Sequence, residues 1–290
     1  MAAVFKQSGT PQMTISAVSY LNTVPMVYGI ARAVESHGNA GGAHPEGLNV
    51  GGLCGHAGEL RALAGTELLL APPRGCAEAF ASGAAQVALL PSAALLDLGG
   101  ARIVTDYCIG ASGDVRTVVI VSDSPIAQVR RLHLDSHSLT SVALSAILCR
   151  ELWGVNPERV PMVDMASLPE TLATARPGDA FLLIGDKVFD YEGRFEYSYD
   201  LARGWRELTG LPFVFAVWVA AAGVGDEYLA GLNVALRYGV EHIPEAVAAS
   251  AHAAKDYAVD YLTRNIDFHL DAAKRRSLAL FLEKAAAAQP

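Results

Sequence analysis

Short apolar runs alternate along most of the chain with longer segments in which apolar residues recur at helical spacing. The runs TISAVSY, TELLLA, AQVALLP, RTVVIVS, RRLHLD, ERVPMVD and GDAFLLIGD predict strands. Residues 24–36 predict a helix with Pro25 in its first turn, and SLTSVALSAILCRELWG predicts another that starts near Ser138 or Thr140 and ends at Gly154. This alternation is typical of an α/β fold.

The later part of the pattern predicts how the chain is divided. The run PFVFAVWVAA is too continuous for a half-exposed edge strand. After it the pattern predicts only helices, at residues 226–241, 244–253, 257–265 and 272–288. We expect two lobes, one formed by residues 1–112 plus 219–290 and the other by residues 113–218. The chain would cross between them near 108–115 and near 212–220, and a ligand would bind in the cleft.

A Gly-rich stretch from about residue 38 to residue 65 interrupts the first lobe. Its composition predicts a long surface insertion. Two interpretations stay open, a plain loop or a segment that covers the cleft.

Composition narrows the class of partner. Of the 290 residues 52% are hydrophobic and 18% charged, and the net charge is −8. This balance argues against nucleic acid, and an anionic ligand would need donors placed locally. The sequence shows no secretory leader and no apolar run long enough for a membrane span, so we expect a cytoplasmic protein. The four cysteines and eight histidines show no metal-binding spacing, which predicts that the chain binds no metal.

Polar residues gather directly after several predicted strands. The clusters are Ser19-Tyr20-Asn22-Thr23, Pro91-Ser92, Ser112-Gly113-Asp114-Arg116, Ser136 to Ser141, and Gly185-Asp186-Lys187. Any one of them is explained by ordinary helix capping, which contributes about 1 kcal/mol. Together they favour a polar pocket, because strand ends meet at one crevice of an open sheet. Free N–H groups at helix starts would suit a carboxylate, and no Gly-rich phosphate loop is present.

Six blocks of sequence carry a resemblance to a known family. In order they are AVSYLNTVPMVYG, QVALLPSAAL, SGDVRTVVIVS, LDSHSLTSVAL, DAFLLIGD and WRELTGLPFVFAVW. As a set they resemble the chorismate dehydratases of the futalosine route to menaquinone, from Thr14 to about Val219. Leu139 stands where that family usually has Arg, so another cation would have to replace it if the Arg binds substrate.

The resemblance implies a fold and a reaction. The family is similar in fold to the two-lobed periplasmic binding proteins of type II, with an inter-lobe cleft, but works inside the cell as an enzyme. Chorismate would lose water, taken from its C3 hydrogen and C4 hydroxyl, to give 3-(1-carboxyvinyloxy)benzoate. This carbon–oxygen lyase reaction needs no cofactor.

Candidate site residues follow from the clusters and the reaction. The two carboxylates of chorismate would contact donors at Ser19, Tyr20, Ser92, Ser138, Thr140 and Ser141. Arg116 would add a bidentate contact or, equally, form a salt bridge at the hinge. The catalytic candidates are Asn22, which would hydrogen-bond the leaving hydroxyl, and Asp186.

Two hypotheses remain for the base that removes the C3 proton. In one the carboxylate of Asp186 takes it, with a pKa raised by burial. In the other the enolpyruvyl carboxylate of the substrate takes it and the protein only positions and polarises. The scarcity of candidate bases in the clusters favours the second.

Two other functions stay open. One is a non-catalytic two-lobed protein that binds small anions, and the other is the sister pathway enzyme, 1,4-dihydroxy-6-naphthoate synthase. The sequence does not decide between a monomer and a homodimer.

Overall fold

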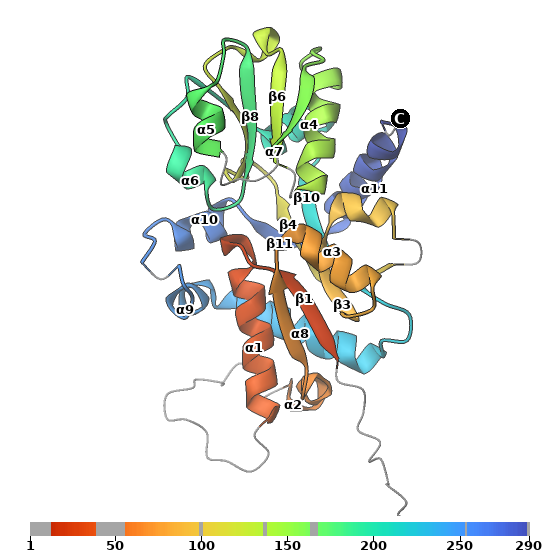
Figure 1. Ribbon diagram of the computed structural model, residues 1–290. Helices are drawn as coiled ribbons and strands as arrows, with labels where there is room; N and C mark the ends of the chain where they lie inside the picture. The colour runs from red at the N-terminus through yellow and green to blue at the C-terminus, as the bar shows by residue number, and fades with distance from the viewer. Residues whose placement is uncertain are drawn as a thin grey trace, which may run out of the picture.

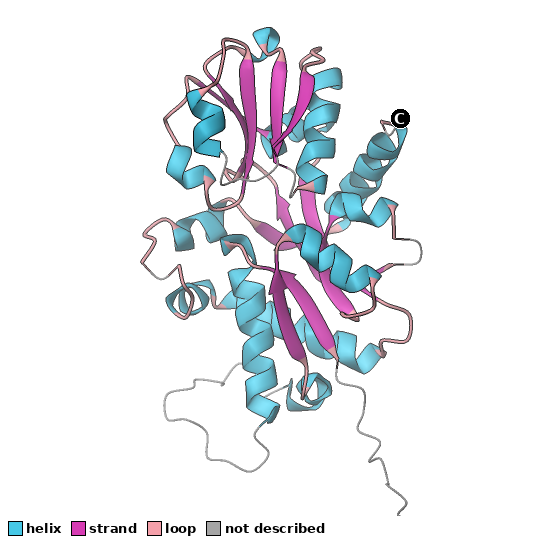
Figure 2. Cartoon of the chain, viewed as in Figure 1, coloured by secondary structure: helices cyan, strands magenta, loops and turns pink. Residues whose placement is uncertain are grey.

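Two α/β lobes, one above the other in Figure 1, make up the computed structural model. It describes residues 13–38, 56–98, 101–135, 138–162, 168–252 and 254–288. The strands of these residues form one sheet of six and one of five, and Figure 2 shows helices packed around each. The predicted α/β class and two-lobed architecture are therefore confirmed.

The six-stranded lobe is built mostly from the first and last parts of the chain. Its strands, in sheet order, are β11 (Asp267–His269), β4 (Arg102–Ala111), β10 (Phe213–Ala220), β3 (Val87–Pro91), β1 (Thr14–Val18) and β2 (Glu67–Ala71). β1 runs parallel to β2 and β3, whereas β10 runs antiparallel to β3 and β4. Every residue of β10 is buried, as its continuous apolar sequence predicts for an interior strand.

Helices cover both faces of this sheet (Figure 1). They are α1 (Val24–Gly38), α2 (Ala57–Leu60), α3 (Pro73–Ala81), α8 (Asp226–Glu241), α9 (Ile243–Ala248), α10 (Ala258–Arg264) and α11 (Ala272–Ala287), with the 3₁₀ turns η1 (Leu21–Thr23), η3 (Arg61–Leu63) and η4 (Ser92–Leu96). The long helix α1 packs along α8, and α11 contacts both β10 and a helix of the other lobe.

The five-stranded lobe holds the middle of the chain. Its strands, in sheet order, are β7 (Glu158–Met162), β6 (Arg131–Asp135), β8 (Asp179–Ile184), β5 (Val118–Ser122) and β9 (Tyr197–Asp200). Its helices are α4 (Leu139–Glu151), α5 (Leu168–Ala173), α6 (Val188–Tyr191) and α7 (Leu201–Thr209), with the turn η5 (Ile126–Gln128). β6 runs parallel to β7 and β8, so the carboxyl ends of β6 and β8 lie at one edge of the sheet.

The sheets correct two sequence predictions. Because β10 pairs along its length with β3 and β4, the second crossing between lobes lies before Phe213 and not after Trp218. The C-terminal region is not purely helical, since Asp267–His269 adds the edge strand β11 beside β4. Three residues are too few for periodicity to reveal a strand.

The Gly-rich insertion is described only in part. Residues 39–55, which hold most of it, lie outside the described residues. The described end is helical: Leu60 of α2 and Leu63 of η3 are buried, so this part of the insertion is not a plain loop.

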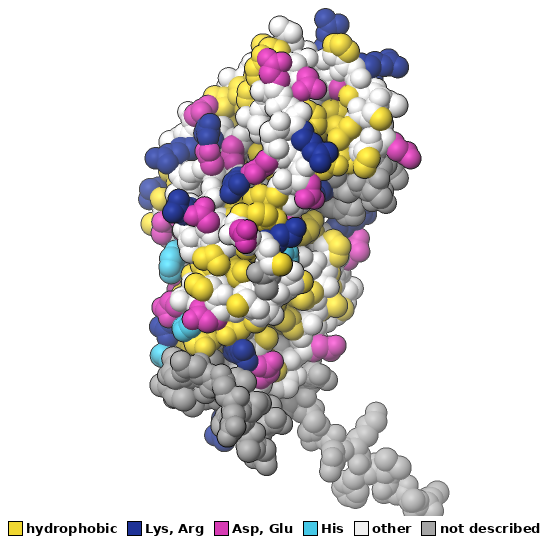
Figure 3. Space-filling view, turned by 90° about the vertical axis from the view of Figure 1, so that its left-hand side faces the viewer, with side chains coloured by type: hydrophobic (Ala, Val, Ile, Leu, Met, Phe, Trp, Pro, Cys, Tyr) yellow, Lys and Arg dark blue, Asp and Glu magenta, His cyan; other side chains and the backbone are white. Residues whose placement is uncertain are grey.

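Charged side chains of both signs are interspersed over the face shown in Figure 3. Within the described part of the chain no helix is long and apolar enough to span a membrane.

Candidate functional site

A cavity lies between the two lobes, at the ends of strands from both sheets. Its volume, measured for the centre of a water molecule, is about 70 Å³, and all empty space there together with open solvent at the mouth is about 570 Å³. The polar residues that line it come from both lobes and are Tyr20, Asn22, Thr23, Thr117, Ser138, Thr140 and Ser141, with Gly185. Its apolar wall is formed by Val18, Pro73, Leu89, Pro91, Ile109, Val115, Val118, Ile184, Phe215 and Ala216.

The turn after β1 places Tyr20 and Asn22 in this cavity. The Thr23 hydroxyl lies 2.5 Å from the carbonyl oxygen of Val18 and 2.7 Å from that of Tyr20, which fixes the turn to the strand end. The Tyr20 ring packs over Gly185 of the other lobe, where an added Cβ would lie 3.5 Å from it. Burial, followed by the nearby carboxylates of Asp135 and Asp186, raises the pKa of Tyr20 to about 12. Its phenol therefore stays protonated at neutral pH and is available as a hydrogen-bond donor to a ligand.

Asn22 lies beside Tyr261, a residue that sequence reasoning missed. Tyr261, from α10, is fully buried, which raises its pKa, and the side chain of Asn22 is among the neighbours that partly lower it. The phenol oxygen of Tyr261 lies 2.7 Å from the hydroxyl of Thr117. Because Tyr261 follows the predicted strands by many residues, no local pattern links it to Asn22.

We expect Tyr261→Phe to lower the free energy of unfolding by about 1–3 kcal/mol, because the buried Thr117 hydroxyl loses its 2.7 Å partner and keeps only a 3.5 Å contact with the carbonyl oxygen of Val115. Urea unfolding followed by circular dichroism measures this. The control is Tyr257→Phe, which removes a hydroxyl from a less buried ring in the same region and should change stability by less than about 0.5 kcal/mol. Equal losses in the two variants would contradict this role for the Tyr261 hydroxyl.

The N-terminus of α4 forms the wall contributed by the five-stranded lobe. Ser138 is its N-cap, as the sequence predicts, and accepts a hydrogen bond from the Ser141 amide at 3.3 Å. The Thr140 Oγ1 accepts from the Ala93 amide at 3.1 Å and lies 3.2 Å from the Phe215 carbonyl oxygen, to which it donates. Thr140 therefore joins the two lobes. Leu139, which stands where the family usually has Arg, is 42% exposed.

Ser19 and Ser92 lie elsewhere. The hydroxyl of Ser92 is fully buried and donates to the carbonyl oxygen of Val214 at 2.7 Å, so it ties η4 to β10 and does not line the cavity. Ser19 is exposed and lines a separate hollow beside α1.

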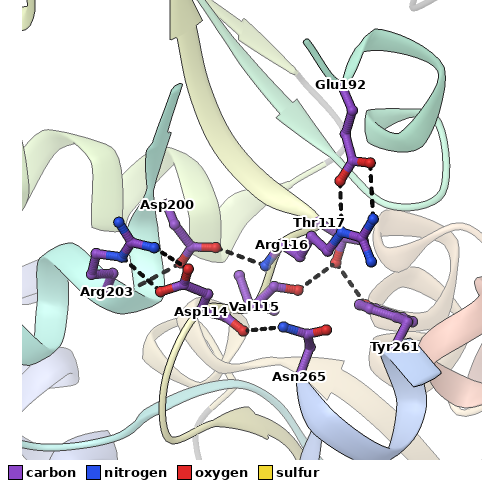
Figure 4. Close-up of polar contacts among 9 residues, drawn as sticks. All are labelled: Asp114, Val115, Arg116, Thr117, Glu192, Asp200, Arg203, Tyr261 and Asn265. Atoms are coloured by element: carbon purple, nitrogen blue, oxygen red, sulfur yellow. Dashed lines mark hydrogen bonds and ion pairs between the residues drawn. The ribbon is translucent and has the colours of Figure 1, made fainter. Parts of the chain in front are cut away.

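Arg116 lies at the first crossing between lobes and is not among the residues that line the cavity; its guanidinium points toward Glu192 (Figure 4). Its guanidinium forms a bidentate pair with Glu192, at 2.6 and 2.9 Å, and its amide donates to Asp200 at 2.7 Å. The neighbouring Asp114 pairs with Arg203, while its carbonyl oxygen accepts from Asn265 at 2.9 Å. Of the two interpretations of Arg116, the geometry supports the hinge salt bridge.

Arg116 also has a left-handed backbone, with φ of 66°. We expect Arg116→Gly to be about 1 kcal/mol more stable than Arg116→Ala, because a Cβ costs roughly 1–2 kcal/mol in this conformation and glycine loses part of that to chain entropy. Both variants remove the guanidinium, so urea unfolding compares the backbone alone. A glycine variant no more stable than the alanine variant would contradict the strain.

Asp186 is not among the residues that line the cavity. Its two carboxylate oxygens each lie 3.1 Å from the Leu21 amide nitrogen, and Oδ2 lies 3.1 Å from Nε2 of His252. Burial raises the pKa of Asp186, while the Leu21 amide, His252 and Lys255 lower it. No local sequence pattern pairs His252 with Asp186, so the sequence does not reveal this contact.

A second ion pair lies near Tyr20. Lys187, after β8, pairs with the fully buried Asp135 at the end of β6. Lys187 belongs to a cluster that the sequence singled out, but it was not chosen as a candidate. No group of three or more metal-binding side chains is found among the residues that the structure describes.

Comparison with known proteins gives both a family and a fold. A family model described as menaquinone biosynthesis matches residues 13–287. Among solved structures, protein AF1704 from Archaeoglobus fulgidus is similar with a TM-score of 0.68 and 14% identity, over 96% of this chain and 98% of that one. The CA3427 gene product of Candida albicans, described as having the generic periplasmic binding protein structural fold, has a TM-score of 0.62 and 12% sequence identity, over 97% of this chain and 92% of that one. The periplasmic aliphatic sulphonate binding protein SsuA from Escherichia coli has a TM-score of 0.50 and 14% sequence identity, over 95% of this chain and 84% of that one.

Proposed function

Because the chain belongs to the menaquinone-biosynthesis family, we propose that it is a dehydratase that converts chorismate to 3-(1-carboxyvinyloxy)benzoate and water. The resemblance of its six sequence blocks to chorismate dehydratases supports this choice within the pathway. Three of those blocks, around Asn22, Thr117 and Ser138, supply polar residues of the cavity.

One observation carries the proposal. Among the described residues that line the cavity there is no Asp, Glu, His, Lys or Arg, and the only ionisable group is the phenol of Tyr20. A phenol with a pKa of about 12 is a donor at neutral pH and not a base poised near it. Such a cavity suits a reaction whose base comes with the substrate, and chorismate carries a carboxylate on the side chain attached to C3.

The cavity would bind chorismate through two kinds of contact. The ring would lie against the apolar wall that includes Leu89, Ile109 and Phe215. A carboxylate would lie at the N-terminus of α4, where the helix dipole favours an anion, beside the hydroxyls of Ser138 and Ser141. The neutral phenol of Tyr20 adds a donor from the opposite lobe.

The reaction itself needs one proton transfer and one bond cleavage. The enolpyruvyl carboxylate of the substrate takes the C3 proton, and the electron pair of the C3–H bond becomes a ring π bond between C3 and C4. The C4–O bond breaks, and the departing hydroxide takes up the proton and leaves as water. Asn22 would donate a hydrogen bond to the leaving oxygen, and Tyr261 lies beside its side chain.

Incubation of the purified chain with chorismate tests the proposal. We expect loss of chorismate and appearance of the aromatic product, followed by absorbance and mass spectrometry. An Asn22→Asp preparation made in parallel controls for contaminating enzymes. Binding of chorismate without turnover would instead indicate a two-lobed binding protein, and turnover of a cyclic futalosine derivative to a dihydroxynaphthoate would indicate the sister enzyme. Either result would overturn the proposal.

A further inference from the structure

The turn that carries Asn22 is capped by the opposite lobe. Tyr20, the N-cap residue of η1, makes no side-chain capping hydrogen bond. The amide of Leu21, the first residue of η1, instead donates to the carboxylate of Asp186, which follows β8 in the five-stranded lobe. Such a cap usually comes from a Ser, Asp or Asn at the start of the same helix. Here Asp186 supplies it from the other side of the cleft.

His252 completes this contact from the six-stranded lobe. Its Nε2 lies 3.1 Å from Oδ2 of Asp186, and about a quarter of its side chain is exposed. Its Nδ1 is buried and has no hydrogen-bond partner among the described residues, so only Nε2 contributes to the contact. The other charged or titratable groups that face Asp186 are Lys255 and the phenols of Tyr20, Tyr257 and Tyr261.

From this geometry we infer that Asp186 and His252 are positioning residues, which couple contact between the lobes to the placement of Asn22. When the lobes meet, Asp186 accepts from Leu21 and fixes η1, so the Asn22 amide faces the cavity. When they separate, Leu21 loses this partner and η1 has no cap of its own. The assignment rests on the proposed function for the role of Asn22, but the contact itself is measurable without turnover.

Hydrogen–deuterium exchange of the full-length chain measures the contact directly. In peptides that contain the Leu21 amide, we expect exchange about tenfold faster in Asp186→Ala than in the unmodified chain, since the amide loses its acceptor. Asp186→Asn keeps an acceptor oxygen and should retain most of the protection. Unchanged exchange in Asp186→Ala would overturn the inference whether or not the chain dehydrates chorismate.

Kinetics with chorismate distinguish positioning from proton transfer. A positioning role predicts that Asp186→Asn keeps kcat within about threefold, whereas Asp186→Ala loses about tenfold or more in kcat/KM. His252→Gln, which restores an N–H near the position of Nε2, should be close to the unmodified chain, and His252→Leu should resemble Asp186→Ala. If turnover by Asp186→Asn instead fell about 100-fold or more while exchange stayed unchanged, Asp186 would be identified as the base. If His252→Gln lost as much kcat/KM as His252→Leu, His252 would not be a positioning residue.

Discussion

Replacement of Asn22 by Asp is expected to lower kcat about 100- to 1000-fold, the loss typical when one donor to a developing negative charge is removed. The substitution keeps the shape of the side chain but replaces its N–H donors with a carboxylate. That carboxylate would face a cavity that must accept a dianionic substrate and that has no cation among its described lining residues. The fall in kcat should therefore come with a rise in KM.

Steady-state turnover of chorismate measures both changes. Asn156→Asp is a matched control, since Asn156 is exposed and outside the cavity, and it should keep kcat and KM within about twofold. Thermal unfolding of the two variants separates a chemical defect from a folding defect. An Asn22→Asp variant with kcat within tenfold of the unmodified chain would contradict the role given to Asn22.

Replacement of Gly239 by Ala is expected to destabilise the chain by about 3 kcal/mol or more, the upper end of overpacking effects. Helices α1 and α8 approach so closely that a Cβ on Gly239 would lie 1.8 Å from the carbonyl oxygen of Pro25. A Cβ on Gly29 would lie 1.9 Å from that of Ala235. Backbone atoms are in contact at both places, so the two helices would have to separate.

The effect should extend to the site, because Pro25 lies just after the turn that carries Asn22. Thermal unfolding is expected to show the loss of stability, and any folded fraction should have reduced kcat/KM. Gly58→Ala is the control, since nothing lies within 4 Å of a Cβ there and the residue is in the short helix α2. A Gly239→Ala variant as stable as Gly58→Ala would contradict the close packing of α1 on α8.

Periodicity was enough to predict elements with long apolar patterns. α8 was expected at residues 226–241 and is found at Asp226–Glu241, and β10 is the buried interior strand that its sequence indicates. The edge strand β11 and the contact between Gly239 and Pro25 depend on partners far away in sequence, so local patterns contain no signal for them.

The candidate site shows the same limit. Asn22, Ser138 and Ser141 could be placed at the cavity because strand ends and helix starts converge there by topology. The partner of Arg116 could not be predicted. From a strand end a guanidinium can reach either a substrate or an acidic side chain, and the sequence does not show that Glu192 lies close to it. Tyr261 and His252 come from C-terminal segments whose packing on the cleft is a property of the whole fold.

In the proposed reaction the substrate's enolpyruvyl carboxylate, and not a side chain, removes the C3 proton. The most direct test compares chorismate with its monoester at that carboxylate under single-turnover conditions. Binding of the ester is established separately by its inhibition of chorismate turnover. We expect the ester to bind and to yield no aromatic product within many turnover times of chorismate. Conversion of the bound ester at a rate near that of chorismate would contradict the claim and require a base on the protein.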